Sequence, residues 1–192
     1  MIKRKLQDVK RSLILEEAAA LFESVGYEQL KLSELAKKVG ISVGTIYGLF
    51  ESKEGLYFAY AEDQIGRFLD ELDTSFAQTE LPEERLRQLF TFKFARFVAK
   101  RKAIEECAKN NPLFFSDIRL RVPELMEKIY VRIAGIIREI APEKSEAEAL
   151  KLAYVLNGLS DGYLMYWFAH DGDLLARMPE LHAQMLTMIK GC

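Results

Sequence analysis

The side chains that most often carry catalysis or hold metal ions are sparse in this chain. It contains two histidines, His170 and His182, and two cysteines, Cys107 and Cys192. The HDGD segment at 170–173 is typical of a turn after a helix, and with His182 it gives no metal-site spacing that we would propose. The two cysteines lack CxxC spacing, and no nucleophile stands with a base and an orienting group. We therefore expect no enzyme activity, no metal and no cofactor.

The chemistry that the sequence does favour is close approach to another surface. The stretch VGISVGTIYGLFESKEGLY, residues 39–57, places glycines inside otherwise helix-forming sequence. Two short helices at 32–39 and 43–49, separated by Gly40, Ile41 and Ser42, are typical of a helix-turn-helix unit. Ser42 is expected to cap the second helix, and Ile46 and Phe50 to face inward.

The outward face of that second helix carries small or uncharged residues: Val43, Gly44, Thr45, Tyr47 and Gly48. Such a face is poorly solvated, and it suits contact with a partner such as a DNA groove. The alternative is that the two glycines let the helix pack tightly against another helix of the same chain. A nucleotide phosphate loop is excluded because the GK[ST] ending, the GxGxxG spacing and a preceding strand are missing.

The elements that position this stretch are predicted to be helices throughout, because apolar residues recur at helical spacing and no segment alternates with period two. Further helices are expected over 6–25, from 53 into the seventies, and over 82–98, 123–140, 145–170 and 179–189. No apolar run reaches the ~20 residues of a membrane helix, and no signal peptide is recognisable, so we expect a cytoplasmic protein with no membrane partner.

Charge gives little guidance, since 27 Lys and Arg stand against 29 Asp and Glu. The net charge of -2 argues for no particular partner. The first eleven residues are different, because they contain five cations, which form either a basic arm that touches phosphate or a solvated terminus. These are Lys3, Arg4, Lys5, Lys10 and Arg11.

At residues 14–57, ILEEAAALFESVGYEQLKLSELAKKVGISVGTIYGLFESKEGLY, the sequence resembles the DNA-binding domain of TetR-type transcriptional regulators. The resemblance implies an all-α fold, with a three-helix DNA-binding domain over 1–52 and a helical ligand-binding and dimerisation domain over 53–192. It departs from the family pattern at Leu30 and Lys31, which replace hydroxyl side chains, so that the helix cap facing Glu34 is lost, and at Leu49. The expected DNA contacts are Ser42, Val43, Gly44, Thr45, Tyr47, Gly48 and Lys53, with Lys31 reaching phosphate in place of the missing hydroxyl.

The resemblance also implies a twofold dimer through the last two long helices and a ligand pocket among the middle ones. The apolar load of the last helices fits an intermolecular bundle or, alternatively, the core of one chain. The expected dimer residues are Leu152, Val155, Leu156, Leu159, Tyr163, Trp167, Leu181, Met185 and Ile189.

The candidate ligand residues are mainly aromatic and suit a small hydrophobic effector, aromatic or acyl. A polar pair on the long apolar helix, Asn157 and Asp161, must be satisfied by a ligand, by the dimer partner or by a backbone carbonyl. The full set is Phe68, Phe90, Phe94, Phe97, Phe114, Tyr154, Asn157 and Asp161, with Phe115 beside them.

The function expected from this pattern is that of a repressor. A homodimer binds a palindromic operator and is released by the ligand, with coupling through the helix that begins after Ser52. The alternatives are an activator, a ligand-independent DNA-binding protein, or a ligand carrier with a vestigial reading head.

Overall fold

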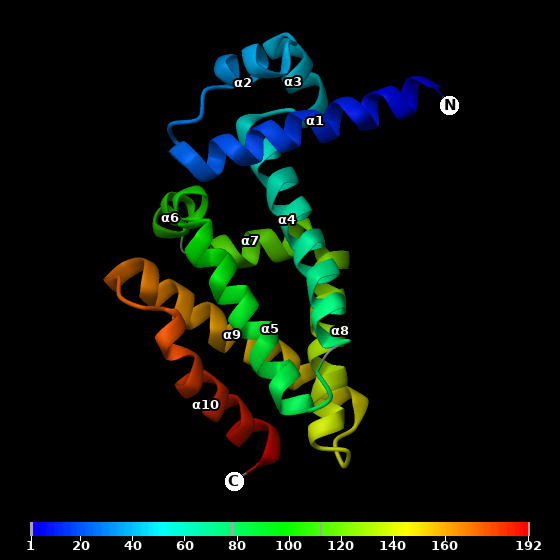
Figure 1. The fold of residues 1–192 in the computed structure, drawn as a ribbon, viewed down its shortest axis with the longest axis vertical. Coiled ribbons are helices and arrows are strands. Elements are labelled where there is room, and N and C mark those ends of the chain that lie inside the picture. The colour runs from blue at the N-terminus through cyan, green and yellow to red at the C-terminus, as the bar shows by residue number, and fades with distance from the viewer. Residues whose placement is uncertain (1, 78, 112, 192) are drawn as a thin grey trace. The chain divides into compact units, whose positions relative to one another are not determined.

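The computed structural model describes residues 2–77, 79–111 and 113–191, with side chains from residue 6 onward. The structure is 84% helical and the described residues form no strand, which confirms the all-α prediction (Figure 1). The helices in chain order are α1 Ile2–Val25, α2 Leu32–Val39, α3 Val43–Phe50, α4 Lys53–Phe76, α5 Pro82–Ala99, α6 Arg101–Asn110, α7 Phe114–Arg121, α8 Pro123–Ile140, α9 Glu146–His170, the 3-10 turn η1 Leu175–Arg177 and α10 Met178–Lys190.

Two short helices, α6 and α7, were missed by the sequence patterns. In α6 the apolar signal is weak, because only Ala103 and Ala108 are buried among charged neighbours. In α7 the buried residue is Phe114, and Leu120 is 75% exposed. Apolar periodicity fails when a helix buries so little surface. The other helices lie where the patterns predicted them, and α1 begins four residues earlier than expected.

The chain forms two compact units. The first contains residues 1–64 and 100–114, and the second contains residues 65–99 and 115–192. Segment 100–114 joins the first unit because α6 packs along α1. These units follow packing, whereas the expected boundary at residue 52 followed a change in helix length, and that functional boundary stays a prediction. The chain passes between the units three times, within α4 and near residues 99 and 114.

The first unit is built around aromatic contacts behind α2 and α3. Phe22 is fully buried, with its ring centroid 5.2 Å from that of Tyr57 and 5.3 Å from that of Tyr60. Leu35 of α2 and Ile46 of α3 have no exposed surface. Burying these side chains removes apolar area from water and fixes α2 against α1 and α3 (Figure 1).

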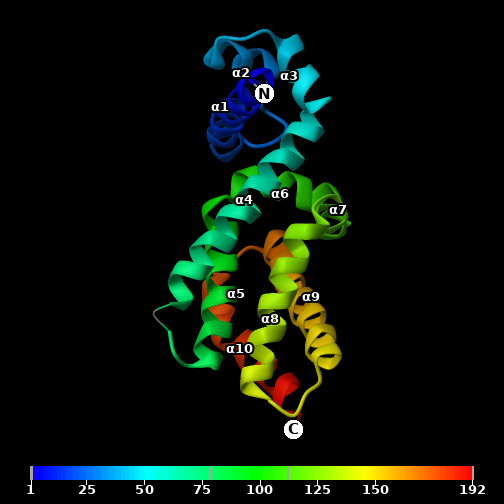
Figure 2. The same cartoon turned by 90° about the vertical axis from the view of Figure 1, so that its right-hand side faces the viewer.

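The second unit is a bundle in which α8 and α9 make the most extensive helix contact (Figure 2). Its fully buried side chains include Phe90, Phe94, Ile133 and Leu156. Helix α9 begins with a capping box, because the Ser145 side chain accepts the Glu148 amide and the Glu148 carboxylate accepts the Ser145 amide. Such a reciprocal cap satisfies two amides that the first turn would leave unpaired.

Among the described helices, none is both long enough and apolar enough to cross a membrane.

Candidate nucleic-acid interface and ligand pocket

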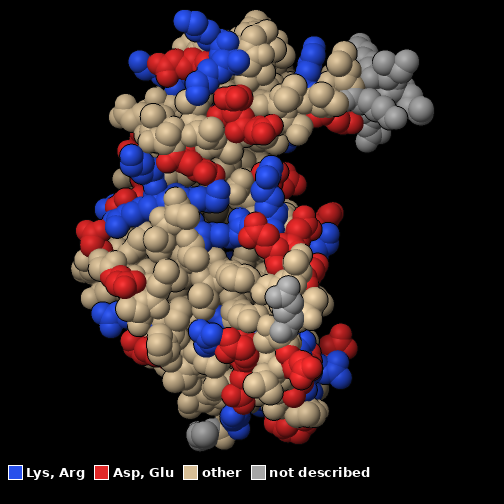
Figure 3. Space-filling model, viewed as in Figure 1, with Lys and Arg blue, Asp and Glu red and all other residues tan. Residues whose placement is uncertain are grey.

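Helix α3 presents the face that the sequence predicted. Ile46 and Phe50 are buried, whereas Gly44, Tyr47 and Gly48 are exposed, with Tyr47 at 50%. Val43 and Thr45 are partly exposed between them. In Figure 3, basic side chains gather over the α2 end of the first unit, and the surface beside them over α3 is uncharged. The arrangement offers hydroxyl and methyl groups flanked by cations, which suits a groove lined by phosphates.

The turn before α3 is fixed by local hydrogen bonds. Gly40 ends α2 in the left-handed conformation, with φ 74°, and its amide bonds to the Ala36 carbonyl. Ser42 Oγ accepts the Thr45 amide at 3.1 Å and lies 2.9 Å from Thr45 Oγ1. Both features were expected, because glycine adopts positive φ without strain and serine caps helix N-termini. The turn between α2 and α3 is therefore held by hydrogen bonds among neighbouring residues.

The two outward glycines of α3 face open space. A Cβ on Gly48 would meet nothing within 4 Å, and one on Gly44 would meet only Ser42 Oγ at 3.7 Å. Within the described part of the chain, no second helix packs on them. The alternative that these glycines serve a tight contact within the chain is therefore wrong for the part that the structure describes.

Gly55, in the first turn of α4, has a different requirement. A Cβ at this position would lie 2.0 Å from the Phe50 carbonyl oxygen, far inside van der Waals contact. Its amide donates to Ser52 Oγ at 2.9 Å, so Ser52 caps α4 as expected. Gly55 is needed because the start of α4 presses against the carbonyl end of α3.

Lys53 and Lys31, both predicted to reach phosphate, differ in their surroundings. Lys53 Nζ donates to the Glu28 carbonyl at 3.0 Å and lies 4.7 Å from the Tyr27 ring centroid. Lys31 is exposed and occupies the N-cap position of α2 without a side-chain cap. The loss of the hydroxyl cap predicted there is confirmed. Leu30 before it is buried, so it serves the core.

The turn that holds Lys53 is itself braced by α6. The Glu28 amide donates to Glu106 Oε2 at 3.1 Å. A Cβ on Gly26 would lie 3.1 Å from the Lys102 carbonyl oxygen, so α6 approaches this turn closely. Sequence patterns gave no signal for this brace, because α6 itself was not predicted.

The two described cations of the basic terminus, Lys10 and Arg11, differ in their surroundings. Arg11 Nη1 donates to the Leu49 carbonyl at 3.0 Å, and the guanidinium lies over the Phe50 ring. Lys10 is exposed. The side chains of Lys3, Arg4 and Lys5 lie outside the described residues. Arg11 therefore supports α3 from behind, a role that the charge pattern did not predict.

Most of the predicted ligand-contacting aromatics are interior side chains. Phe90 and Phe94 have no exposed surface, and Phe68 and Phe114 are 7% and 4% exposed. Phe114 belongs to the first unit, whereas the rest of the set belongs to the second. Phe97 is partly exposed, and its ring is tilted against that of Phe115, at 5.8 Å between centroids. Tyr154 is 42% exposed and lies on the Tyr130 ring at 3.8 Å. The ligand-binding role of this set stays a prediction.

Asn157 and Asp161 are satisfied by a partner that the sequence reasoning did not consider. Lys93 of α5 donates to Asn157 Oδ1 at 2.9 Å, to Ser160 Oγ at 2.7 Å and to Asp161 Oδ1 at 2.6 Å. Asn157 Nδ2 also donates to Asp161 Oδ2 at 3.2 Å. An ammonium group has three N–H donors, and all three are used here. We call Lys93, Asn157, Ser160 and Asp161 the Lys93 cluster.

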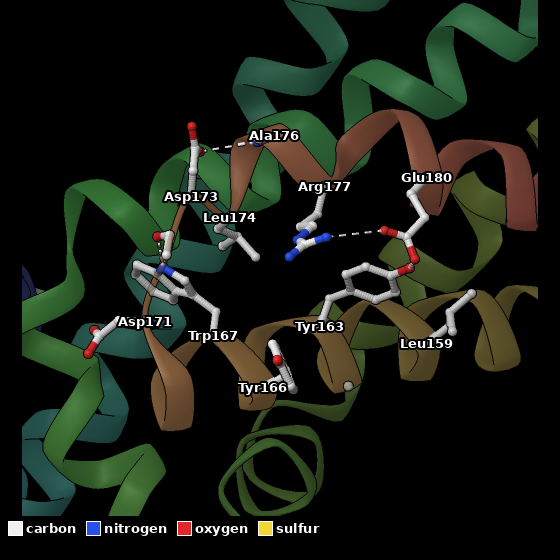
Figure 4. A pocket seen from close by; sticks show the side chains of 12 residues that line it. Leu159, Tyr163, Tyr166, Trp167, Asp171, Asp173, Leu174, Ala176, Arg177 and Glu180 are labelled. Carbon is white, nitrogen blue, oxygen red and sulfur yellow. Dashed lines mark hydrogen bonds and ion pairs between the residues drawn. The ribbon is translucent and has the colours of Figure 1, made fainter.

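A pocket of about 600 Å³ opens between α9 and the segment that leads into α10 (Figure 4). Figure 4 shows the Arg177 side chain pointing into the space between Trp167 and Tyr163. Tyr163 Oη donates to Glu180 Oε1 at 3.0 Å, and burial together with this bond raises the pKa of Tyr163. The lining residues are Leu159, Gly162, Tyr163, Tyr166, Trp167, Asp171, Gly172, Asp173, Leu174, Ala176, Arg177 and Glu180.

The predicted dimer residues divide into two groups. Leu156, Trp167, Leu181, Met185 and Ile189 are at most 5% exposed, so they form the core of their own unit. Side chains buried in this way cannot contact a second copy, so for these five the alternative of a single-chain core holds. The exposed or partly exposed members are Leu152, Val155, Leu159 and Tyr163.

Cys107 is the cysteine that the structure describes, and it is partly buried. Burial raises the pKa of the Cys107 thiol to about 11, against a smaller opposing effect of its bond to Tyr57. The thiol is therefore protonated at neutral pH, whereas reactive cysteines are thiolates at that pH. No three His, Cys, Asp or Glu side chains among the described residues cluster as metal ligands.

Comparison with known proteins bears on this geometry directly. The family described as bacterial regulatory proteins, tetR family, matches residues 14–60. The HTH-type transcriptional regulator EthR of Mycolicibacterium smegmatis is 28% identical over 189 residues, which cover 95% of this chain and 84% of that protein. The fatty acid metabolism regulator protein of Bacillus subtilis is 26% identical over 82 residues, 43% of this chain. The match spans 42% of that relative, less than half its length.

Among solved structures, the transcriptional regulator FadR from Bacillus subtilis, in complex with stearoyl-CoA, has a TM-score of 0.71. Its identity is 19%, and the match covers 92% of this chain and 97% of that one, which shows a shared fold. The family match contains α2, α3 and the turn between them, together with the capped start of α4. Residues 14–60 of the chain therefore form a DNA-binding domain of the kind found in bacterial regulatory proteins of the tetR family.

Proposed function

We propose that this chain is a repressor that binds a palindromic operator as a homodimer and leaves it when a small hydrophobic ligand binds. The observation that carries the proposal is the outward face of α3, where glycines stand beside Thr45 and Tyr47 over open space. A helix face with such small side chains lets the backbone come close to base edges, while nearby cations bind the phosphates. With few polar groups on the face, DNA shape and thymine methyl contacts supply part of the specificity.

The DNA contacts can be tested without knowing the operator. Duplexes enriched by the wild-type protein from a random library should share a palindrome, and Tyr47→Ala with Lys53→Ala should reduce binding to them at least tenfold. Lys128→Ala on α8 is the matched control, because Lys128 is exposed on the second unit. Unchanged binding by the double variant would remove the contact assignment. Failure to enrich any sequence would remove the repressor proposal.

Dimerisation is proposed through the outward faces of α9 and α10. Val155 and Tyr166 are 44% and 61% exposed on α9, and Met188 is 40% exposed on α10. Gly158 and Gly162 lie between Val155 and Tyr166 with open space beside them, which permits close approach of a second helix. Exposed apolar surface of this kind favours an isologous contact. Sedimentation of the purified chain should give a dimer, and a strictly monomeric chain would contradict the proposal.

For the ligand we propose an acyl chain, free or as a thioester. Support comes from the aromatic and aliphatic interior of the second unit and from the likeness to a solved regulator in complex with stearoyl-CoA. Binding of an acyl chain requires interior aromatic side chains such as Phe90 and Phe94 to move apart. The ligand therefore selects a conformation that differs from the closed one, in which both side chains are fully buried. Its effect on DNA requires different affinities for the two conformations.

Trp167 is the single tryptophan, which makes the ligand test direct. Lauroyl-CoA, stearoyl-CoA, lauric acid and coenzyme A are titrated separately while Trp167 fluorescence and release from the enriched duplex are followed. Acyl compounds should release DNA, and coenzyme A alone should not. DNA binding that is indifferent to all four would favour ligand-independent binding, and stimulated transcription of a reporter would favour an activator. Acyl binding by a chain that enriches no duplex would favour the ligand carrier.

A further inference from the structure

Arg11 lies on α1 and reaches the far end of the reading helix. Its Nη1 atom donates to the Leu49 carbonyl at 3.0 Å. Its guanidinium carbon is 4.6 Å from the centroid of the Phe50 ring, and Phe50 is buried. Two separate contacts thus join one side chain to the last two residues of α3. Neither contact leaves the guanidinium group extended toward solvent as an arm.

The end of α3 needs such a partner. The last carbonyls of a helix have no amide from a following turn. Here the Glu51 amide bonds to the Tyr47 carbonyl and the Ser52 amide bonds to the Phe50 carbonyl, in a turn where Glu51 has φ 66°. The Leu49 carbonyl receives the Arg11 donor, and a cation is favoured at a helix C-terminus. Because α3 has only eight residues, its own hydrogen bonds hold it weakly.

We infer that Arg11 is a positioning residue, which fixes the direction of α3 in the DNA groove without contacting the phosphate backbone. The inference rests on the proposed DNA-reading role of α3. It adds that the Arg11 side chain sets the orientation of this helix. The α3 end packs closely on the start of α4 where Gly55 lacks a side chain, and Arg11 bonds the same end to α1. Removing Arg11 should therefore change which sequences are preferred.

A phosphate contact would behave differently. Each phosphate contact that is lost lowers the slope of log affinity against log salt by about 0.9, and weakens all sequences alike. A positioning residue leaves the salt slope unchanged and weakens the preferred sequence most. The two roles also separate under Arg11→Lys, because lysine keeps the charge but lacks the planar fork that bonds and stacks at once.

The experiment compares Arg11→Gln, Arg11→Lys and the exposed neighbour control Lys10→Gln. The probes are a duplex enriched by the wild-type protein and a scrambled duplex, each titrated at several salt concentrations. Both Arg11 variants should bind the enriched duplex about tenfold more weakly, with little change on the scrambled duplex and no change in slope. Lys10→Gln should keep the sequence preference. A lower slope with Arg11→Gln, or full preference with Arg11→Lys, would overturn the inference.

A second readout needs no DNA. Amide hydrogen exchange of segment 43–52 should be faster in both Arg11 variants, by about tenfold, and unchanged in Lys10→Gln. Exchange in 123–140 of the second unit reports any general loss of stability. Equal exchange in all variants would overturn the inference. If the wild-type protein enriches no duplex, the DNA-reading role of α3 fails, while the exchange measurement still decides whether Arg11 anchors the helix.

Discussion

Helices α3 and α9 both expose a pair of glycines, but their inner faces are held by different groups. Each has two exposed glycines four residues apart, Gly44 and Gly48 on α3 and Gly158 and Gly162 on α9, with open space beside them. Behind α3, the anchors are backbone groups, since the Arg11 bond and the Gly55 contact both involve carbonyls of its last residues. Behind α9, the anchors are side chains of the Lys93 cluster.

The difference teaches what each region tolerates. A helix that is held through its backbone carbonyls is sensitive to small changes in the residues beside them. One added side-chain atom next to such a carbonyl is enough to displace the helix. A helix held by a side-chain cluster depends on the partner charge instead, and both partners can be exchanged together. Substitutions at the inner anchors should change stability, whereas substitutions on the exposed faces should change DNA binding or dimerisation.

The largest effect is expected at Gly55. Gly55→Ala places a Cβ 2.0 Å from the Phe50 carbonyl oxygen, a backbone atom that cannot move aside, and should cost more than about 3 kcal/mol of unfolding free energy. Gly48→Ala is the matched control, because its new methyl group meets open space and alanine favours helix by up to about 1 kcal/mol. Denaturant unfolding measures both. Equal stability of the two variants would contradict the backbone anchor.

The same Gly48→Ala variant tests the outward face of α3. It should retain or gain stability while losing affinity for the enriched duplex, because the methyl group enters the space reserved for DNA. Gel-shift titration measures the affinity. Unchanged DNA binding would show that α3 does not approach DNA closely at this residue.

Next in size is the anchor of α9. Lys93→Met leaves the Asp161 carboxylate beside Asn157 without its cation, and should cost about 2–4 kcal/mol, a range reduced from that of fully buried pairs because Asp161 is 22% exposed. Adding Asp161→Leu removes the stranded charge and should restore much of the loss. Thermal unfolding of the single and double variants gives the coupling. Purely additive losses would mean that the cluster does not act as a unit.

A smaller effect on folding, but a large one on assembly, is expected on the outer face of α9. Gly162→Glu adds a charge where a second copy is proposed to lie, so dimerisation should weaken at least tenfold while the unfolding free energy changes by less than about 1 kcal/mol. Lys151→Glu, on an exposed turn of the same helix, is the control for added negative charge. A Gly162→Glu chain that sediments as the wild type does would move the proposed interface elsewhere.

The smallest effect is expected away from both helices, on α6. The Arg101 hydrogen bond holds the pKa of Glu105 at about 2, against an ordinary value of 4.5, with a further contribution from Lys109. A lowered pKa stabilises the fold above pH 4.5, and that contribution is lost as the pH falls from 4.5 toward 2. Glu105→Gln should therefore cost less than about 1 kcal/mol at pH 7, and this cost should disappear as the pH falls through 2. Glu62→Gln on α4 is the control, and a pH-independent difference would contradict the assignment.

The fold of α2, α3 and the turn between them was predicted well from the sequence, because it depends on local interactions. The Ser42 cap, the Gly40 turn and the inward Ile46 depend on residues within four positions of one another. The Lys93 cluster was out of reach, since Lys93 meets partners 64–68 residues away. Trp167 and Leu181 fit a dimer seam and a single-chain core equally well by spacing, and only packing separates the two. Gly55 needed a distance to the Phe50 carbonyl that no pattern contains.

The Lys93 cluster also has a mechanical consequence. Three bonds from one ammonium group fasten α5 to α9 at a single level, and sliding either helix by one residue would shift it by about 1.5 Å and stretch all three together. The cluster therefore couples the positions of the two helices. A ligand that displaced α9 along its axis would break these bonds unless α5 moved with it.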